Sequence, residues 1–393
     1  MITRLNTKNG QQVSQLSFGC MRFPKSDDET QRLIEYAVQN GVTHFDTAYV
    51  YGNSEVVLGR ILQRTGLRGS ITIATKLPLH KVKRLEDLDK IFYEQLKRLQ
   101  TTWVDYYFMH CMAHVGTWKR LQKLGIEGWI ESKKRSGEIA NLGFSFHGGS
   151  EDFAPIVDAY GWDFCMIQFN YTDENYQAGR AGLEYLAERA IPIMIMEPLR
   201  GGELVNKLPA EAVGIFAAEN AERSPAEWAH RWVFNHPQIL TSLSGMSNMA
   251  MLEENIRVAS VAGAGNLSAQ ELEVFERVKA VLKRTDKINC TTCGYCVPAC
   301  AMGVDIPACF SCYNEIAVSG KRAAFKKYVM TTSMKTPRSN AGRCNGCGAC
   351  EKLCPQQVGI AAELKRVRKK LEPFYYRPAA WVMKRVLKLE PDA

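Results

Sequence analysis

SITIATK (residues 70–76), LEDLDKIFYEQLKRLQ (85–100) and VDYYFMH (104–110) follow one another along the chain and decide its fold. The first and third stretches are short and rich in β-branched and aromatic residues, as strands are. The middle stretch repeats apolar residues at helical spacing and carries its charges on the other face. A strand, a helix and a strand in this order predict a βαβ unit, whose two strands are parallel.

The same alternation runs through the first 282 residues. The other stretches expected to be strands are QLSFGCM (15–21), VTHFDTA (42–48), NLGFSFH (141–147), FCMIQFNY (164–171), IPIMIME (191–197) and ILTSLSG (239–245). Helical patterns include residues 27–40, 54–64 and 224–236, and a closing helix is expected over 268–284. Eight strand–helix units in about 280 residues predict a (β/α)8 TIM barrel, because a doubly wound sheet rarely has eight evenly spaced units.

Eight of the thirteen cysteines form two copies of one pattern, Cys290-x2-Cys293-x2-Cys296-x3-Cys300 and Cys344-x2-Cys347-x2-Cys350-x3-Cys354-Pro355. In two-cluster ferredoxins, the first three cysteines of such a run hold one [4Fe-4S] cube and the fourth ligates the neighbouring cluster. Zinc ribbons use CxxC pairs a dozen or more residues apart, and disulfide frameworks belong to small secreted domains. The spacing therefore predicts two [4Fe-4S] clusters, held by Cys290, Cys293, Cys296 and Cys354 and by Cys344, Cys347, Cys350 and Cys300.

The cysteine pattern also predicts the domain organisation. We expect a barrel over residues 1–283, a dicluster domain over 284–372 and a basic C-terminal tail over 373–393. The 43 residues between the two runs include a helical pattern, so an α-helical ferredoxin-like domain is favoured over a βαβ one. The tail is amphipathic, and would dock a partner, rest on a membrane surface or pack back over the barrel. The remaining cysteines are expected to be buried small apolar side chains: Cys20, Cys111, Cys165, Cys309 and Cys312.

The charge distribution bears on partners and compartment. The net charge is +9, and residues 283–393 carry 20 Lys and Arg against 8 Asp and Glu. A basic surface suits an acidic electron-transfer protein such as a ferredoxin or flavodoxin, although solvated lysines explain the charge equally well. We expect no nucleic-acid partner, since no reading motif accompanies the charge, and no transmembrane segment or signal peptide. Free cysteines and oxygen-sensitive clusters favour a reducing cytoplasm.

Polar residues at the ends of consecutive predicted strands are the catalytic candidates. They are Asp46, Lys76 and His110, with Tyr51 in the loop after Asp46. Taken singly, each has an ordinary explanation as a loop cap, a solvated charge or a structural histidine. Catalytic residues of TIM barrels stand at the C-terminal ends of the strands, so the joint placement on strands two, three and four favours an active site.

FDTAYVYGNSE (45–55), TK (75–76) and DYYFMH (105–110) resemble the aldo-keto reductase family, and the resemblance covers residues 1 to about 262. CTTCGYCVPACAMGVDIP followed by YNE resembles the second domain of a bacterial and archaeal branch of that family. The resemblance implies that the chain reduces an aldehyde or ketone with hydride from NAD(P)H. It implies that Tyr51 is the general acid, that Lys76 lowers the phenol pKa from about 10, that Asp46 holds Lys76, and that neutral His110 orients the substrate.

The resemblance implies a nicotinamide site that this chain alters. The residues expected to bind NADP(H) or NAD(H) are Met21, Ser145, Gln168, Leu199, Gly201, Ser247, Glu254 and Asn255. Phe146 replaces the family's asparagine, Met196 replaces a stacking tyrosine, and Gly245 and Met251 replace the Lys and Arg that clamp the 2′-phosphate of NADP. Arg200 would partly compensate, although a loop arginine is as often a plain surface residue. The choice between NAD and NADP therefore stays open.

Two other functions remain open. The clusters carry single electrons, hydride transfer moves two, and no stretch resembles a flavin site that would interconvert them. Reduced ferredoxin could pass electrons through the clusters to a barrel-bound substrate without a nicotinamide. The chain could also be a non-catalytic, redox-sensing subunit, although a complete set of four catalytic candidates argues against it. The loops that set the substrate of a TIM barrel do not identify the carbonyl compound.

Overall fold

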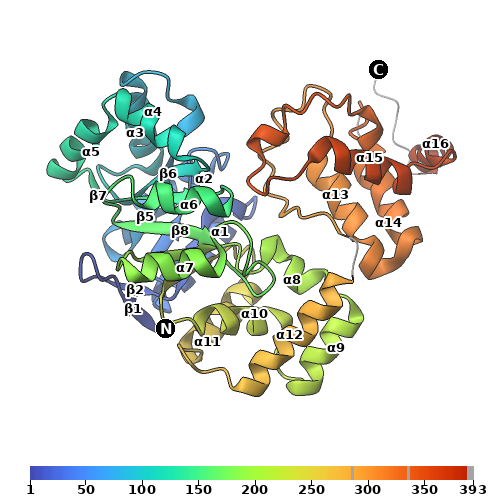
Figure 1. Cartoon of the computed structure of the whole chain (residues 1–393), viewed down its shortest axis with the longest axis horizontal. Coiled ribbons are helices and arrows are strands. Elements are labelled where there is room, and N and C mark those ends of the chain that lie inside the picture. Colours follow the sequence, from blue (N-terminus) through green and yellow to red (C-terminus); the bar gives the residue numbers. More distant parts are fainter. Residues whose placement is uncertain (285–286, 334–336, 387–393) are drawn as a thin grey trace. The chain divides into compact units, whose positions relative to one another are not determined.

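The computed structural model describes residues 1–284, 287–333 and 337–386. Eight parallel strands close into a barrel in the order β10-β3-β4-β5-β6-β7-β8-β9 (Figure 1). Their bounds are β3 (Leu16–Gly19), β4 (His44–Asp46), β5 (Thr72–Pro78), β6 (Val104–Met112), β7 (Ile139–Phe146), β8 (Phe164–Gln168), β9 (Ile193–Met196) and β10 (Ile239–Ser244). Each lies within or overlaps one of the eight expected stretches, so the predicted TIM barrel is confirmed.

Helices alternate with these strands along the chain. They are α1 (Asp27–Gln39), α2 (Ser54–Thr65), α3 (Glu86–Leu99), α4 (Val115–Lys123), α5 (Ile126–Arg135), α6 (Ser150–Val157), α7 (Gly179–Glu188), α10 (Pro225–Phe234) and α11 (Met249–Val261), with short 3-10 turns η1 (Cys20–Arg22), η2 (Leu67–Ser70) and η3 (Leu79–Lys81). An antiparallel hairpin of β1 (Thr3–Leu5) and β2 (Gln12–Ser14) precedes the barrel. Sequence patterns did not predict this hairpin, because three-residue strands are too short to show an alternation.

Aromatic side chains fill the barrel. Tyr106 and Phe108 of β6 both meet the ring of Phe164, with centroids 5.1 and 4.6 Å apart. Tyr107, between them, points to the outer layer and packs against Phe92 and Trp129 of the helices. Successive residues of a strand face opposite sides, which explains this division. The interior is thus a packed core, and the polar residues at the strand ends lie at its rim.

The described chain forms two compact units. The first comprises residues 1–199 and 226–272 and contains the barrel; the second comprises residues 200–225 and the described residues from 273 onward. The segment between β9 and α10 therefore packs with the cysteine-bearing part of the chain, although the barrel pattern surrounds it in sequence. The limits expected from sequence, at 283 and 372, remain predictions.

The second unit is helical. Its elements are η4 (Arg200–Gly202), α8 (Glu203–Asn206), α9 (Ala210–Glu219), α13 (Ile306–Asn314), α14 (Ile316–Ser333), η5 (Ala341–Arg343), η6 (Glu351–Leu353), α15 (Ile360–Leu371) and α16 (Tyr376–Val386), and α12 (Ala269–Lys283) leads into it. No strand occurs in its described residues, which agrees with the expected α-helical ferredoxin-like domain. The Tyr376 hydroxyl of α16 lies 2.5 Å from that of Ser333 at the end of α14. Residues 387–393 of the expected tail lie outside the described residues.

Two serines at helix starts play different parts. Ser268 caps α12, since its Oγ accepts a hydrogen bond from the amide of Glu271, whose carboxylate accepts one from the amide of Ser268. Ser54 does not cap α2, since Asn53 occupies the cap position and Ser54 begins the helix. The Ser54 hydroxyl instead donates to the carbonyl of Cys20 at 2.8 Å. Among the described residues, no helix is both long and apolar enough to cross a membrane.

Candidate active site and cluster-binding site

The four catalytic candidates meet at the C-terminal ends of β4, β5 and β6. The Nζ of Lys76 lies 2.5 Å from Asp46 Oδ1 and 2.7 Å from the carbonyl oxygen of Thr47. It also lies 4.9 Å from the centroid of the Tyr51 ring. The Tyr51 ring lies 6.1 Å from that of His110, at an interplanar angle of 81°. The structure thus brings together all four residues that the sequence singled out.

The ion pair of this site is buried. Asp46 is 3% exposed and Lys76 is 1% exposed. Burial raises the pKa of the Asp46 carboxyl above its usual value, and the neighbouring Lys76 ammonium opposes the shift. Removal of one partner would leave the other charge buried and uncompensated, which is costly. Each side chain therefore holds the other in place.

His110 is held neutral. It is 6% exposed, and burial lowers its pKa well below the usual value, with further contributions from Lys76, His147 and His80. A neutral imidazole at this position can donate one hydrogen bond to a substrate oxygen. His147 follows Phe146 at the end of β7, and burial, together with the Lys76 charge, lowers its pKa to about 4. His147 closes the expected strand 141–147 and so met the strand-end criterion, but sequence reasoning passed over it because the family pattern directs attention to the residue before it.

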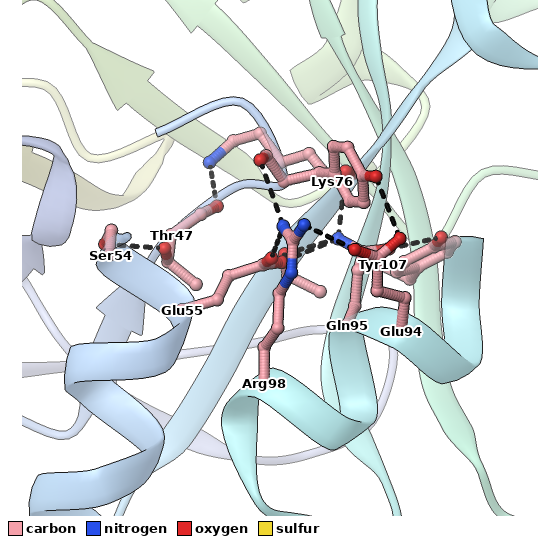
Figure 2. Close-up of polar contacts among 10 residues, drawn as sticks. Thr47, Ser54, Glu55, Lys76, Glu94, Gln95, Arg98 and Tyr107 are labelled. Carbon is pink, nitrogen blue, oxygen red and sulfur yellow. Dashed lines mark hydrogen bonds and ion pairs between the residues drawn. The ribbon is translucent and has the colours of Figure 1, made fainter. Parts of the chain in front are cut away.

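A polar network supports Lys76 from the helix layer (Figure 2). Glu55, which is 1% exposed, accepts hydrogen bonds from Thr75 Oγ1 at 2.6 Å, Gln95 Nε2 at 2.8 Å and Arg98 Nη1 at 3.1 Å. The same Gln95 nitrogen lies 3.1 Å from the backbone carbonyl of Lys76. Figure 2 shows Glu55 of α2 next to Gln95 and Arg98 of α3, joined by dashed lines. The network therefore ties the strand that carries Lys76 to both neighbouring helices.

A close approach of α2 and α3 makes this network possible. A Cβ on Gly59 would lie 2.4 Å from the carbonyl oxygen of Arg98, so only glycine fits there. Arg98 also donates to the carbonyl of Tyr49 at 3.4 Å, in the loop that carries Tyr51. Sequence reasoning missed the network. Its one signal was Gln95, a polar residue on the apolar face of the predicted helix.

The expected nicotinamide-binding residues lie in several elements. Ser145 and Gln168 stand at the ends of the adjacent strands β7 and β8; Met21 is in η1, Ser247 precedes α11, Glu254 and Asn255 are in α11, and Leu199 and Gly201 follow β9. Ser145 Oγ accepts from the amide of Cys111 at 2.9 Å, Gln168 donates to Asp173 at 2.8 Å, and Asn255 donates to Ser244 Oγ at 3.1 Å. Gly201 belongs to the second unit, and the other seven residues belong to the first.

Phe146, Met196 and Met251 depart from the family pattern, and their side chains provide no hydrogen-bond donor to a nucleotide. Phe146 packs on Phe153 of α6, with ring centroids 4.8 Å apart. Met196 is half-buried against the barrel core, and Met251 is 41% exposed on α11. Arg200 is not a surface residue, since it is 5% exposed and forms an ion pair with Glu203 at 3.5 Å.

The four cysteines predicted to hold the first of the two clusters border one pocket. One pocket is bordered by Cys290, Cys293, Cys296 and Cys354, together with apolar residues such as Phe310. The fourth cysteine thus comes from the other run, as the ferredoxin rule requires. In the second set, burial raises the pKa of Cys350, and the nearby thiols of Cys300 and Cys344 contribute.

These residues fit a polynuclear iron–sulfur cluster. No charged side chain borders the pocket, and backbone amides point at ligand sulfurs, as from Thr292 to Cys290 and from Gly346 to Cys344, each at 3.4 Å. Burial raises the pKa of the Cys290 thiol to about 12, but iron would reverse this because a coordinating thiol is deprotonated. Among the described residues, no three Cys, His, Asp or Glu side chains converge closely enough for a single metal ion.

The other cysteines mostly match expectation. Cys20, Cys165, Cys309 and Cys312 are buried, as predicted. Cys111 is partly exposed, so its predicted burial was wrong. Its backbone has φ 56° where the pairing of β6 with β7 becomes irregular, which carries the side chain to the rim. None of the thirteen cysteines, all within the described residues, forms a disulfide.

Comparison with known proteins agrees with both parts of the chain. Residues 15–278 match the model of the Aldo/keto reductase family, and residues 289–359 match that of a 4Fe-4S dicluster domain. The 9,11-endoperoxide prostaglandin H2 reductase of Trypanosoma cruzi is 26% identical over 259 residues, covering 64% of this chain and 83% of that protein. Aldo-keto reductase str7 of Strobilurus tenacellus is 32% identical over 297 residues, covering 63% and 85%.

Solved structures show the same fold. The holo form of aldo-keto reductase AKR11C1 from Bacillus halodurans superposes with a TM-score of 0.59 at 21% identity, covering 71% of this chain and 96% of that one. An aldo-keto reductase from Klebsiella pneumoniae in complex with NADPH gives 0.58 at 19% identity, with the same coverage. Since the family model spans 264 of the 393 residues, the chain is an oxidoreductase of the aldo/keto reductase family whose barrel is followed by a 4Fe-4S dicluster domain.

Proposed function

We propose that the chain reduces an aldehyde or ketone with hydride from NAD(P)H, with Tyr51 as the general acid, and that its C-terminal domain holds two [4Fe-4S] clusters. The observation that carries the proposal is the meeting of the Tyr51 phenol with the buried Lys76 ammonium and with neutral His110. Carbonyl reduction needs an acid that gives a proton to the carbonyl oxygen and a positive charge that lowers the pKa of that acid. It also needs a hydrogen-bond donor that orients the carbonyl group.

Each side chain has one task in this reaction. NAD(P)H, when bound, supplies the hydride that goes to the carbonyl carbon. Tyr51 gives its hydroxyl proton to the carbonyl oxygen, and the ammonium of Lys76 stabilises the phenolate that remains. Asp46 keeps Lys76 charged and in position, while His110 donates a hydrogen bond to the same oxygen. Hydride and proton together balance the reduction, so this step takes no electron from the clusters.

The cofactor is proposed to lie against Met21, Ser145, Gln168, Leu199, Gly201, Ser247, Glu254 and Asn255. The NADPH-bound Klebsiella pneumoniae structure supports a nicotinamide. Because Gly245 and Met251 provide no cation, we expect weaker discrimination in favour of NADP than a two-cation clamp gives.

Replacement of Tyr51 by phenylalanine tests the proposal. We expect the Tyr51→Phe variant to lose about 10²- to 10⁴-fold in carbonyl-dependent NAD(P)H oxidation, with an unchanged circular dichroism spectrum. Tyr49→Phe is the matched control, because Tyr49 lies in the same loop but its hydroxyl donates to Glu94. Near wild-type turnover in the Tyr51→Phe variant would show that Tyr51 is not the general acid.

The proposed clusters are held by Cys290, Cys293, Cys296 and Cys354 and by Cys344, Cys347, Cys350 and Cys300. Cys347 is the exposed member. The proposed partner is an acidic one-electron carrier of the ferredoxin or flavodoxin class, supported by the excess of Lys and Arg over residues 283–393. We propose a reducing cytoplasm as the compartment, supported by thirteen cysteines that form no disulfide among the described residues. Two clusters require about eight iron atoms per chain, which iron analysis measures.

One observation favours a second candidate function. The altered positions favour electron delivery from the clusters to a barrel-bound substrate without a nicotinamide; they are Phe146, Met196, Gly245 and Met251. Anaerobic titration with NADH and NADPH separates the two functions. Tight binding with no bleaching of the clusters supports hydride transfer, whereas no binding of either nucleotide supports the ferredoxin-linked route.

A further inference from the structure

Side chains of β7 alternate between the helix layer and the barrel interior. Phe144 and Phe146 both pack on Phe153 of α6, with ring centroids 6.4 and 4.8 Å apart. Gly143 faces the interior, since a Cβ there would lie 2.6 Å from the ring of Phe164 in the barrel core. Because successive residues of a strand face opposite sides, the even-numbered residues of this strand face the helices and the odd-numbered ones face inward.

His147 follows the last residue of β7 and continues this alternation. Its amide donates to the carbonyl of Met112 on β6 at 3.0 Å, so the parallel pairing extends to it. The backbone comes close to β6 again at the next residue, because a Cβ on Gly148 would lie 2.2 Å from the carbonyl oxygen of Ala113 and only glycine fits. The partly buried His147 side chain is therefore held on the inner side of the barrel rim.

The inner side of this rim is where the catalytic candidates meet. Burial and the nearby Lys76 ammonium lower the pKa of His147. Burial lowers the pKa of His110 most, and Lys76 and His147 lower it further, so the two imidazoles lie near each other as well. They stand at the ends of the neighbouring strands β6 and β7. His147 is thus a fifth polar side chain at the place where the substrate carbonyl is proposed to bind.

The reacting carbonyl oxygen cannot serve as the partner of this fifth side chain. A carbonyl oxygen has two lone pairs, and in the proposed reaction the donors Tyr51 and His110 use both. His147 therefore needs a different atom of the substrate. Its pKa of about 4 makes the ring neutral at pH 7, so it can both donate and accept a hydrogen bond, as a hydroxyl group does. A neutral ring does not attract a carboxylate by charge, so a hydroxyl is the group that it suits.

We propose that His147 is a specificity-determining residue that binds a hydroxyl group on the carbon next to the reacting carbonyl, so that 2-hydroxy aldehydes are preferred to plain aldehydes. The inference rests on the proposed function, in which His110 orients the carbonyl oxygen. The neighbouring carbon is the expected place, because His147 stands on the strand next to that of His110 and both rings lie near Lys76. His147 takes no part in the transfer of hydride or proton, so the reduction balances as before.

The test compares lactaldehyde with propanal, which differ by that one hydroxyl group. Steady-state kinetics with NADPH and the full-length, cluster-loaded protein give kcat/KM for each aldehyde. We expect a kcat/KM about tenfold higher for lactaldehyde, because a site that hydrogen-bonds a substrate hydroxyl discriminates against the analogue that lacks it. The KM for NADPH is measured alongside, because it reports on the cofactor and not on the aldehyde.

His147→Leu removes the proposed hydrogen bond. We expect its ratio of kcat/KM for lactaldehyde to that for propanal to fall to within about twofold of one. His147→Gln keeps a donor and an acceptor, and should retain a ratio above about threefold. His114→Gln is the matched control and should keep the wild-type ratio, because the His114 side chain is 69% exposed and pairs with Asp152. Circular dichroism and iron content show whether each variant is folded and loaded.

The outcomes separate this inference from the function on which it rests. Equal kcat/KM values for the two aldehydes in the wild-type protein overturn the inference and leave the reductase proposal intact. A preference for lactaldehyde that survives in His147→Leu also overturns it, since the hydroxyl is then bound elsewhere. A raised KM for NADPH in that variant, with an unchanged aldehyde ratio, places His147 at the cofactor instead. Reduction of neither aldehyde by wild-type protein that binds NADPH overturns the proposed function together with this inference.

Discussion

His230 provides a sharp test of how burial controls the stability of the barrel. This residue of α10 is fully buried, and among the described residues neither ring nitrogen has a hydrogen-bond partner. Its ring stacks on that of Phe234, with centroids 5.6 Å apart. Burial lowers the His230 pKa to about 4. We expect His230→Leu to make the barrel less sensitive to acid.

The magnitude follows from the difference between the folded and unfolded pKa values. In the unfolded chain the imidazole has a pKa of about 6.5, so below that pH the unfolded state binds a proton that the folded state does not. Stability therefore falls as pH falls from about 6.5, and the fall levels off below the folded pKa of about 4. Between pH 7 and pH 5, His230 alone accounts for a loss of about 2 kcal/mol in the free energy of unfolding.

The measurement is urea unfolding of both proteins at pH 7 and pH 5, followed by tryptophan fluorescence. Other buried histidines, such as His44 and His147, titrate in both proteins and cancel in the difference. The leucine variant should lose about 2 kcal/mol less than the wild type on acidification. His114→Gln is the control, because the His114 side chain is 69% exposed. An unchanged pH dependence in His230→Leu would mean that the imidazole is solvated in the folded protein and that the reasoning is wrong.

Three further predictions concern the support network, the clusters and the cofactor. Glu55→Ala should lower the free energy of unfolding, measured in urea, by about 3–5 kcal/mol, because it leaves buried hydrogen-bond donors without an acceptor. Arg98→Met should lower it less, because Arg98 is partly exposed. Equal losses in the two variants would show that Glu55 is not the centre of the network. Cys354→Ser should lose about half of the iron while Cys309→Ser keeps it all, and iron loss in the second variant would contradict the ligand set. Gly245→Lys with Met251→Arg should raise the preference for NADPH over NADH at least about tenfold in steady-state kinetics, because Gly245 is exposed and a Cβ there would have no atom closer than 3.9 Å. An unchanged preference would show that the nucleotide phosphate does not reach these positions.

Much of the active site could be predicted from the sequence because strand ends mark it. Asp46, Lys76 and His110 close three consecutive strand patterns, and in a parallel barrel those ends meet at one rim. Glu55 was visible in the same motif, but its partners Gln95 and Arg98 come from a helix about forty residues further on. Gln95 stands out as a polar residue on an apolar helix face, but no local pattern shows that it pairs with Glu55, because hydrogen bonds between distant segments depend on how the helices pack.

The sequence by itself determined the barrel and was enough to propose the cluster ligands. Both depend on spacing over short stretches of sequence. The barrel follows from the alternation of strand and helix patterns, and the proposed ligands follow from cysteines separated by two or three residues. Only the tertiary structure decided that residues 200–225 pack with the cysteine-bearing unit. The bond between Glu203 and Asn314 joins positions 111 residues apart, and burial of polar groups makes that pairing obligatory. Such a pairing is selected by the fold as a whole, which is why the sequence pattern assigned this segment to the barrel alone.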